Sequence, residues 1–437
     1  MKFMKLISGL AALFLAGSLW AFILMRADNG AVIHWSNLSP VYLVNNNSAN
    51  STTKLCVADP VATVQNAFSA WNNAAPLTIS VTYGGTTSLS DFCGKKLDDT
   101  GCDSTNLVLF SSQWEGGAFP AGALALTVSY YDTGDGVLGG VDMIFNDGIK
   151  WSDDPLNHAN ASCKGSSVYS ISAVANHEAG HFYGLDHSFV GYIGENFVPG
   201  MAATMFPVYF GNTVWQDMVS LEQDDKAGVY FLYPQAPNPG WGMITGKVSS
   251  QNGGMFGVSV QAIRASDAAP VLGVVSEADG SYMLFGLPPG DYYAYAESPT
   301  IMGESYTYWV MDYYSSADKV PYIQLYKDIQ VSSYTQLDAG STIFLRAGAI
   351  PVAADGTVSG VDFNYTLPSP PPATNKPGAV DDYDDGDDDD DEDSGCGCVL
   401  NPRRAVSGPE LDLASVSALF LLFGLGLRSL RRRESAA

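Results

Sequence analysis

The sequence predicts an α+β domain over residues 30–234 and a β-sandwich over residues 242–366. One observation is HEAGHFYGLDH, residues 177–187, whose histidines recur at the spacing of one helix face. Another is YPQAPNPGWG, residues 233–242, where three prolines indicate a linker at residues 235–241. Beyond it, short β-branched and aromatic runs alternate with Gly, Asp and Pro, a pattern typical of antiparallel sheets.

Length and charge limit the class of protein. The chain has 437 residues, of which 46% are hydrophobic, so it can form two or three folded domains. Its formal net charge is −25, and eleven acidic residues lie in DDYDDGDDDDDED at residues 381–393. Without these eleven negative charges the net charge is still −14 (−25 + 11), so the acidity is general. We therefore expect no nucleic-acid partner, because phosphate binding requires a basic surface.

The first 21 residues predict an export signal. MKFMKLISGLAALFLAGSLWA begins with lysines and continues as an apolar run with small residues, so we expect cleavage near Ala21. The apolar run continues through Phe22–Met25, which leaves an uncleaved membrane anchor as the alternative.

Four cysteines lie in the first predicted domain. In an exported chain, two disulfides are favoured among Cys56, Cys93, Cys102 and Cys163, and the sequence leaves all three pairings open. A tetra-cysteine zinc site is the weaker alternative, because these cysteines contain no CxxC pair.

HEAGHFYGLDH holds three of the five histidines in the chain. His177 and His181 are four residues apart and share one face of a helix, which we expect over residues 168–184. Gly184 tolerates the left-handed conformation that ends a helix, so His187 can come round to the same point. Three neutral imidazoles and water form the four-coordinate site typical of catalytic zinc. A helix with surface histidines is the alternative, and the scarcity of histidine argues against it.

The pattern HExxHxxGxxH resembles that of the metzincin metalloproteases. Downstream, AATMFPVY supplies Met205, with Pro207 and Tyr209 two and four residues on. This spacing resembles the matrixin branch. The resemblance implies that Met205 forms the methionine turn and that Pro207 and Tyr209 form a wall of the substrate pocket.

The likeness to matrixins extends over most of residues 30–234. AVIHW (31–35) resembles the first strand, and residues 61–83 resemble the first helix and the strand after it. TNLVLFSSQ and GVDMIFND resemble core strands, and LEQDDKAGVYFLYP (221–234) resembles the closing helix. The resemblance implies a metzincin fold, in which a twisted mixed sheet lies over helices.

These residues together imply a zinc endopeptidase that acts on proteins or peptides outside the cytoplasm. Zinc lowers the pKa of a bound water to about 7 and polarises the scissile carbonyl. Glu178 then accepts the proton of the water and passes it to the departing amine. We expect the substrate to pair as an extra strand with GALALTVSY, residues 122–130. The alternative is a surface adhesin that keeps the zinc fold for binding only, and Glu178 argues against it.

Two features depart from the animal matrixins. Their second, structural zinc is held largely by histidines, but only His34 and His158 remain here, so we expect that site to be absent. AVIHW follows the leader almost directly, so we expect no latency through a long propeptide with a zinc-capping cysteine.

A structural calcium site is a further expectation. YYDTGDGVLGGVD places Asp132, Asp135 and Asp142 around a glycine-rich turn, and calcium prefers carboxylate oxygens. Asx turns without any ion explain the same residues as well.

The second domain has no cluster of residues that indicates chemistry. GKV, GVSVQAI and ADGSYMLFGLPPGDYYAYA follow in an order that resembles the carboxypeptidase regulatory-like domain. Without such a cluster we expect a stabilising or spacing role, and ligand binding by exposed tyrosines is the alternative. Residues 367–395 are proline-rich and then acidic, which predicts a disordered, extended stalk.

The last segment, residues 396–437, contains Cys396 and Cys398, an apolar stretch at 413–427 and terminal arginines. It resembles the bacterial MYXO-CTERM and JDVT-CTERM sorting tags. The resemblance implies cleavage by a sortase-like membrane protease and anchoring at the outer surface of a Gram-negative bacterium. A plain membrane anchor is the alternative.

Overall fold

The computed structural model describes residues 22–45, 55–93, 95, 102–114, 117–119, 122–193, 196–197, 202–209, 215–298, 300–301, 304–305, 317–331, 346–367 and 396–398. The predicted leader, acidic stalk and apolar C-terminal stretch lie outside these residues. Within the described part of the chain, no helix is both long and apolar enough to cross a membrane. All elements below belong to one compact unit, residues 1–399.

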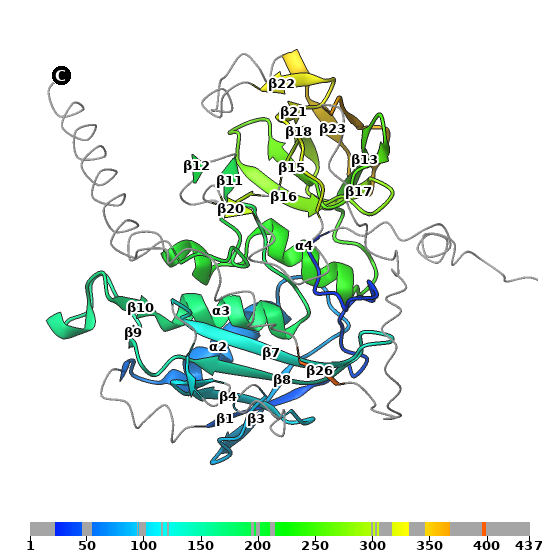
Figure 1. Cartoon of the computed structure of the whole chain (residues 1–437). Helices are drawn as coiled ribbons and strands as arrows, with labels where there is room; N and C mark the ends of the chain where they lie inside the picture. The colour runs from blue at the N-terminus through cyan, green and yellow to red at the C-terminus, as the bar shows by residue number, and fades with distance from the viewer. Residues whose placement is uncertain are drawn as a thin grey trace, which may run out of the picture. The chain divides into compact units, whose positions relative to one another are not determined.

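The first part of the chain is built on a mixed sheet with the strand order β7-β8-β4-β1-β3. Strands β3, β1, β4 and β8 run parallel, whereas β7 is antiparallel to β8 (Figure 1). This is the mixed sheet that the sequence predicts. Its strands are β1 (Val41–Asn45), β3 (Thr82–Thr87), β4 (Asn106–Phe110), β7 (Ala125–Asp132) and β8 (Leu138–Phe145), and β26 (Cys396–Cys398) pairs with the end of β7.

Residues 31–35 do not form the first strand of this sheet, contrary to the prediction. They make isolated bridges only, between Arg26 and Val32 and between His34 and Val137. The pairing is short because residues 36–39 bend away directly afterwards. The first strand of the sheet is therefore β1.

Two helices lie over one face of the sheet (Figure 1). Helix α2 (Pro60–Asn72) begins where the side chain of Asp59 accepts a hydrogen bond from the N–H of Ala62, and proline fits its first turn. Helix α3 (Ile171–Phe182) packs against α2, and the indole N–H of Trp71 donates to the carbonyl of Asn176 at 2.8 Å. The sheet, α2 and α3 thus enclose one apolar core.

Helix α3 begins at Ile171 rather than at residue 168. The three preceding residues form β10 (Val168–Ser170), which pairs in parallel with β9 (Lys150–Ser152). The hydroxyl of Ser170 then caps the helix by accepting from the N–H of Ala173 at 3.3 Å. A third helix, α4 (Gln223–Leu232), follows, as predicted.

Short elements complete this part. The smaller strands are β2 (Leu55–Cys56), which pairs with β9, the pair β5 (Gln113–Trp114) and β6 (Gly117–Ala118), and the pair β11 (Tyr192–Ile193) and β12 (Asn196–Phe197). Two 3₁₀ turns span Ala161–Cys163 and Trp215–Val219.

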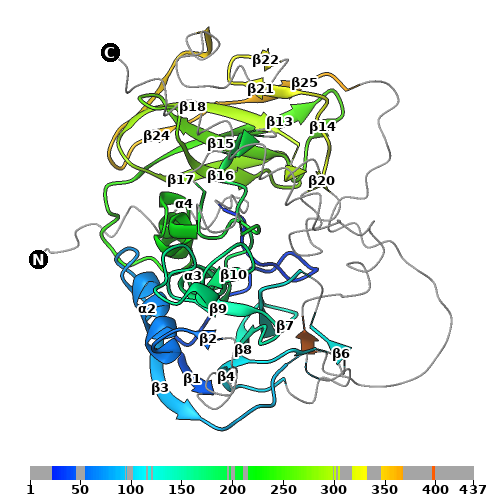
Figure 2. The same cartoon turned by 90° about the vertical axis from the view of Figure 1, so that its left-hand side faces the viewer.

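The second part consists of two sheets that share an apolar core (Figure 2). Ile244 and Leu284 from the first sheet, and Val260 and Ala294 from the second, are fully buried in it. The first sheet contains β14 (Gly253–Gly254), β13 (Gly242–Ser250), β17 (Ser281–Leu287), β24 (Thr357–Val358) and β25 (Phe363–Tyr365). The second contains β16 (Pro270–Val275), β15 (Ser259–Arg264), β18 (Gly290–Glu297), β21 (Ile323–Leu325), β22 (Ile329–Val331) and β23 (Ile350–Val352). Strands β19 (Thr300–Ile301) and β20 (Glu304–Ser305) form a separate pair.

This arrangement differs in one respect from the antiparallel sandwich predicted. Strands β24 and β25 pair with β13 in parallel, so the first sheet is mixed. The chain leaves β23 in the other sheet before it reaches β24, and this crossing between sheets sets the direction of the last strands.

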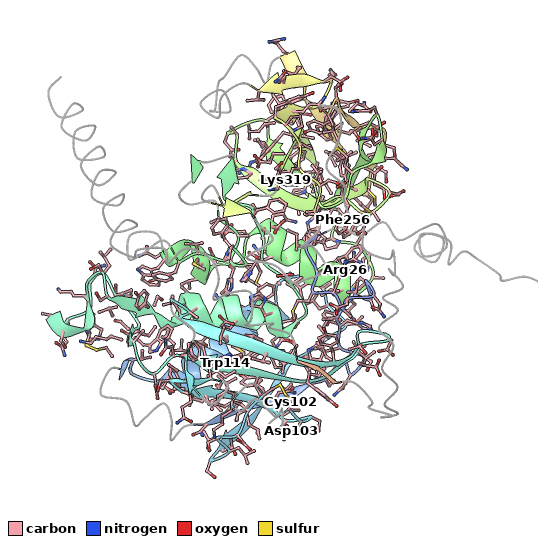
Figure 3. The ribbon with its side chains drawn as sticks, viewed as in Figure 1. Arg26, Cys102, Asp103, Trp114, Phe256 and Lys319 are labelled. Atoms are coloured by element: carbon pink, nitrogen blue, oxygen red, sulfur yellow. A yellow bond between two sulfur atoms is a disulfide. The ribbon has the colours of Figure 1, made fainter. Side chains whose placement is uncertain are left out.

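The folded part begins earlier than residue 30. Phe22–Met25 are buried, and Leu24 forms a bridge with Leu185 in the segment that leads to His187. The side chain of Arg26, labelled in Figure 3, is paired with Glu277 at 2.8 Å. These apolar residues therefore belong to the protein core.

Candidate active site

Helix α3 places His177 and His181 one turn apart on the same face. The helix ends at Phe182, and Gly184 adopts a φ of +98°. A Cβ atom at Gly184 would lie 2.5 Å from the carbonyl oxygen of Ile33. Glycine is thus required both by the backbone conformation and by the close approach of another segment.

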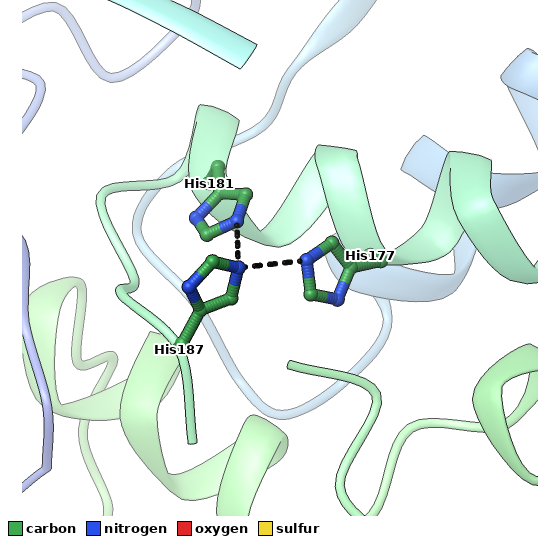
Figure 4. A group of neighbouring side chains, drawn as sticks. All are labelled: His177, His181 and His187. Carbon is green, nitrogen blue, oxygen red and sulfur yellow. Dashed lines mark hydrogen bonds between the residues drawn. The ribbon is translucent and has the colours of Figure 1, made fainter. Parts of the chain in front are cut away.

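The predicted zinc ligands converge (Figure 4). The Nε2 atom of His187 lies 3.2 Å from that of His181 and 3.2 Å from that of His177. Two nitrogens each bound ~2.0–2.1 Å from a tetrahedral zinc ion lie ~3.3 Å apart, so the observed spacing fits zinc.

Backbone partners fix the tautomers of the two helical histidines. The Nδ1 atom of His177 is 2.8 Å from the carbonyl oxygen of Thr204, and that of His181 is 2.8 Å from the carbonyl oxygen of Leu185. A carbonyl only accepts, so both Nδ1 atoms carry the proton and both Nε2 atoms present lone pairs. Two lone pairs that point at the same place form a suitable binding site for a cation.

Burial keeps these imidazoles neutral. It lowers the pKa of His177 to about 4, although the hydrogen bond to Thr204 opposes the shift. Burial also lowers the pKa of His181 well below its ordinary value, with the neighbouring histidines adding to the effect. Zinc binds neutral imidazole, so the two helical ligands are in the protonation state that the metal requires.

The side chain of Met205 packs against helix α3 at Gly180. A Cβ atom at Gly180 would lie 2.1 Å from the sulfur of Met205 and 2.7 Å from Cζ2 of Trp71. The residue between the two helical ligands therefore has to be small. Met205 itself is buried, as a methionine turn under the site requires.

Asp225 holds the backbone of this turn, and the sequence did not single it out. Its carboxylate accepts hydrogen bonds from the N–H groups of Thr204 at 2.9 Å, Met205 at 3.1 Å and Glu222 at 2.7 Å. Burial raises the pKa of Asp225 to about 6, and the three N–H donors oppose this. The acidic pair at the start of α4 is the one feature of the sequence that indicates this role. A carboxylate that becomes buried there needs hydrogen-bond donors from a neighbouring segment.

Glu178 lies beside the histidines and is 5% exposed. Its carboxylate oxygen Oε2 accepts a hydrogen bond from the hydroxyl of Thr127 on β7 at 2.6 Å. Burial raises the pKa of Glu178 to about 7, and the hydrogen bond from Thr127 partly offsets that effect. Thr127 lies in the predicted docking strand, residues 122–130, but no sequence pattern marks it as a partner of Glu178.

Pro207 and Tyr209 follow the methionine turn and are half-buried. The hydroxyl of Tyr209 accepts a hydrogen bond from the N–H of Ser170 at 3.1 Å, and its ring meets that of Tyr169 edge to face. Burial raises the pKa of the Tyr209 hydroxyl. The segment is thus tied to the beginning of α3, and its role as a pocket wall stays a prediction.

The three aspartates predicted to bind calcium do not come together. Asp132 and Asp135 are exposed and accept from the N–H groups of Gly134 and Val137, as in Asx turns. Asp142 is buried, and its two oxygens accept from the N–H groups of Cys93 and Leu107. Among the described residues, the only group of three or more His, Cys, Asp or Glu placed to hold a metal is the histidine triad. The structure therefore does not bring the predicted calcium ligands together, and calcium binding stays a prediction.

The four cysteines of the first part form two disulfides, Cys56–Cys163 and Cys93–Cys102. Cys102 is labelled in Figure 3. This selects one of the three pairings and removes the alternative of a tetra-cysteine zinc site.

The remaining predicted site residues lie elsewhere. Cys396 and Cys398 lie in β26. The ring of His34 hydrogen-bonds to the carbonyl oxygen of Val32, and His158 lies 3.5 Å from Asp153.

Comparisons with known proteins cover the same stretch. Residues 34–234 match the family model described as matrixin. Matrix metalloproteinase-18 of Xenopus laevis is 27% identical over 192 residues, which are 44% of this chain and 32% of that protein. Interstitial collagenase of Oryctolagus cuniculus is 28% identical over 192 residues, 44% of this chain and 31% of that protein. The match spans about a third of the length of these curated relatives. Because the family match, the mixed sheet and the three converging histidines fall in one stretch, residues 34–234 are a matrixin domain.

Proposed function

We propose that this chain is a zinc-dependent endopeptidase that hydrolyses peptide bonds in proteins outside the cytoplasm. The observation that carries the proposal is the convergence of three histidine Nε2 atoms beside the buried carboxylate of Glu178. The matrixin domain supports the reaction class, because matrixins use a catalytic zinc.

The proposed mechanism assigns one role to each group. Zinc held by His177, His181 and His187 would acidify a water and polarise the scissile carbonyl. Glu178 accepts the proton that the water loses as it attacks, and then donates it to the nitrogen of the departing amine. The reaction consumes one water. Its hydroxyl group becomes part of the new carboxyl terminus, and its proton reaches the new amino terminus through Glu178.

Strand β7 is the proposed docking strand for the substrate. Within the described part of the chain, its outer edge pairs only with β26, at Tyr130–Asp132. Thr127 of β7 contacts Glu178, so a peptide paired alongside Ala125–Ser129 would pass next to the general base. Pro207 and Tyr209 are the proposed wall of the pocket that receives a substrate side chain.

We further propose that the protein works at the outer surface of a Gram-negative bacterium. The two disulfides support an oxidising compartment. Cys396 and Cys398 would direct processing by a sortase-like membrane protease, which leaves the acidic stalk as a spacer from the membrane. The two-sheet part, proposed as a carboxypeptidase regulatory-like domain, would support the catalytic part.

The full chain, metal-free and zinc-loaded, should be assayed with casein and with an internally quenched peptide. We expect hydrolysis that a chelator abolishes and added zinc restores. The variant His187→Ala should lose zinc and hydrolysis together, because three ligands become two. The matched control His158→Ala should keep both.

Two results would reject the proposal. Zinc bound by the three histidines without any turnover would favour the binding-only adhesin. Turnover that continues without metal would place the active site elsewhere.

A further inference from the structure

The side chain of Thr127 faces α3. On the same face of β7, Ala125 and Tyr131 belong to the core that contains the helix, whereas Leu126 and Val128 pack on the opposite face. The pairing with β8 fixes this register, since Thr127 lies opposite Met143. A shift by one residue would turn the hydroxyl away from the helix.

The hydroxyl of Thr127 has two acceptors on one residue. Its oxygen lies 2.6 Å from Oε2 of Glu178 and 3.2 Å from the backbone carbonyl oxygen of Glu178. A hydroxyl carries a single proton, and hydrogen bonds from hydroxyl to carboxylate are typically ~2.5–2.7 Å long. The Thr127 hydroxyl therefore donates its hydrogen bond to Oε2 of the carboxylate and not to the backbone carbonyl.

This hydrogen bond restricts a side chain that otherwise rotates about three bonds. Glu178 is 5% exposed, so little water is available to orient its carboxylate. Thr127 is β-branched, which limits its own χ1 and makes its hydroxyl a fixed reference point. Because Oε2 is engaged by Thr127, Oε1 is the oxygen left to receive the proton of the attacking water.

We propose that Thr127 is a positioning residue that orients Glu178 for proton transfer, an inference that rests on the proposed function. A purely structural role, tying β7 to α3, is the competing explanation. Both roles predict some loss of stability when the hydroxyl is removed, so the test has to separate the donor from the packing.

Two substitutions achieve this separation. Thr127→Val keeps the shape and removes the donor, whereas Thr127→Ser keeps the donor and removes a methyl group. Thr82→Val, at an exposed position in β3, is the matched control for replacing a strand threonine by valine. All are made in the full chain and loaded with zinc, and their zinc content is measured before the kinetics.

A misplaced general base should lower kcat while substrate binding is kept. We expect Thr127→Val to lower kcat by about 10- to 100-fold with KM within about twofold. Thr127→Ser should stay within about threefold of wild type, and Thr82→Val should not change kcat. A Thr127→Val variant with wild-type kcat, or a Thr127→Ser variant as slow as Thr127→Val, would overturn the proposal.

A second measurement does not depend on activity. Melting temperatures of the metal-free protein are compared for Thr127→Val, Glu178→Ala and the double variant. If the two side chains are coupled, the two losses will not add in the double variant, since the first substitution already removes the contact. Additive losses would overturn the proposal. If the wild type cleaves no peptide, the proposed function fails, while this cycle still decides whether Thr127 holds Glu178.

Discussion

The carboxylate of Asp224 accepts a 2.7 Å hydrogen bond from the hydroxyl of Ser188, the residue directly after His187. The N–H of Ser188 donates to the carbonyl oxygen of Met205 at 2.8 Å. The other oxygen of Asp224 accepts from the N–H of Gly273, in β16, at 2.9 Å. One buried carboxylate thus joins the segment that carries the third histidine to α4 and to the second part of the chain.

Replacing Asp224 by alanine should weaken both the fold and the metal site. The substitution leaves buried donors without partners, so the free energy of unfolding should fall by about 2–4 kcal/mol. Zinc affinity should fall about tenfold, because the segment bearing His187 loses its anchor. Urea unfolding and chelator competition measure the two effects, with Asp28→Ala at an exposed position as the control. Unchanged zinc affinity would show that Asp224 does not hold this segment.

Gly180 offers a test in which two effects have opposite signs. In an exposed helix, glycine to alanine stabilises by about 1 kcal/mol. A Cβ atom here would meet the sulfur of Met205 at 2.1 Å and the ring of Trp71 at 2.7 Å. We therefore expect Gly180→Ala to lower the free energy of unfolding by about 1–3 kcal/mol. Gly290→Ala, where the nearest atom is 3.7 Å away, is the control. A stabilised Gly180→Ala protein would contradict the packing described.

The buried Asp142 should make stability depend on pH. Burial raises its pKa from 3.8 to about 7, although the N–H groups of Cys93 and Leu107 oppose the shift. The folded protein therefore holds this proton more tightly than the unfolded chain, so the contribution of Asp142 falls as pH rises from about 4 to about 7. Relative to Asp142→Asn, which does not titrate, the wild type should lose about 2–4 kcal/mol over that range. Denaturant unfolding at several pH values measures this, with the exposed Asp291→Asn as control. A difference that stays constant with pH would refute it.

The two disulfides should contribute unequally. Cys56–Cys163 closes a loop of 107 residues, and Cys93–Cys102 a loop of 9. The loss of chain entropy in the unfolded state predicts a contribution of about 5 kcal/mol for the first and about 2.5 kcal/mol for the second. Paired Cys→Ser variants measured by denaturant unfolding test this order. Equal losses would indicate that unfolded-state entropy is not the main effect.

The helical part of the site could be predicted from sequence because its determinants are local. The four-residue spacing of His177 and His181 and the conformational freedom of Gly184 act within one stretch of the chain. Thr127 could not be predicted in the same way, because it meets Glu178 across 51 residues of sequence. Asp225 likewise reaches Met205 from 20 residues away.

The differences between the predicted and observed positions of residues 31–35 and Asp142 have a common cause. Residues 31–35 have the composition of a strand, but the bend that follows them limits their pairing to single bridges. Asp142 lies close in sequence to Asp132 and Asp135, yet it is directed into the core, where backbone donors occupy its oxygens. Sequence proximity does not show which face of a strand or turn a side chain takes.

The central claim is that Glu178 is the general base beside a zinc ion held by the three histidines. Its most direct test is to measure zinc content and peptide hydrolysis together in Glu178→Gln, a variant that keeps an oxygen to accept from Thr127. We predict one zinc per chain and a kcat at least about 100-fold lower than that of wild type. A variant that keeps its zinc and cleaves peptide at nearly the wild-type rate would contradict the claim.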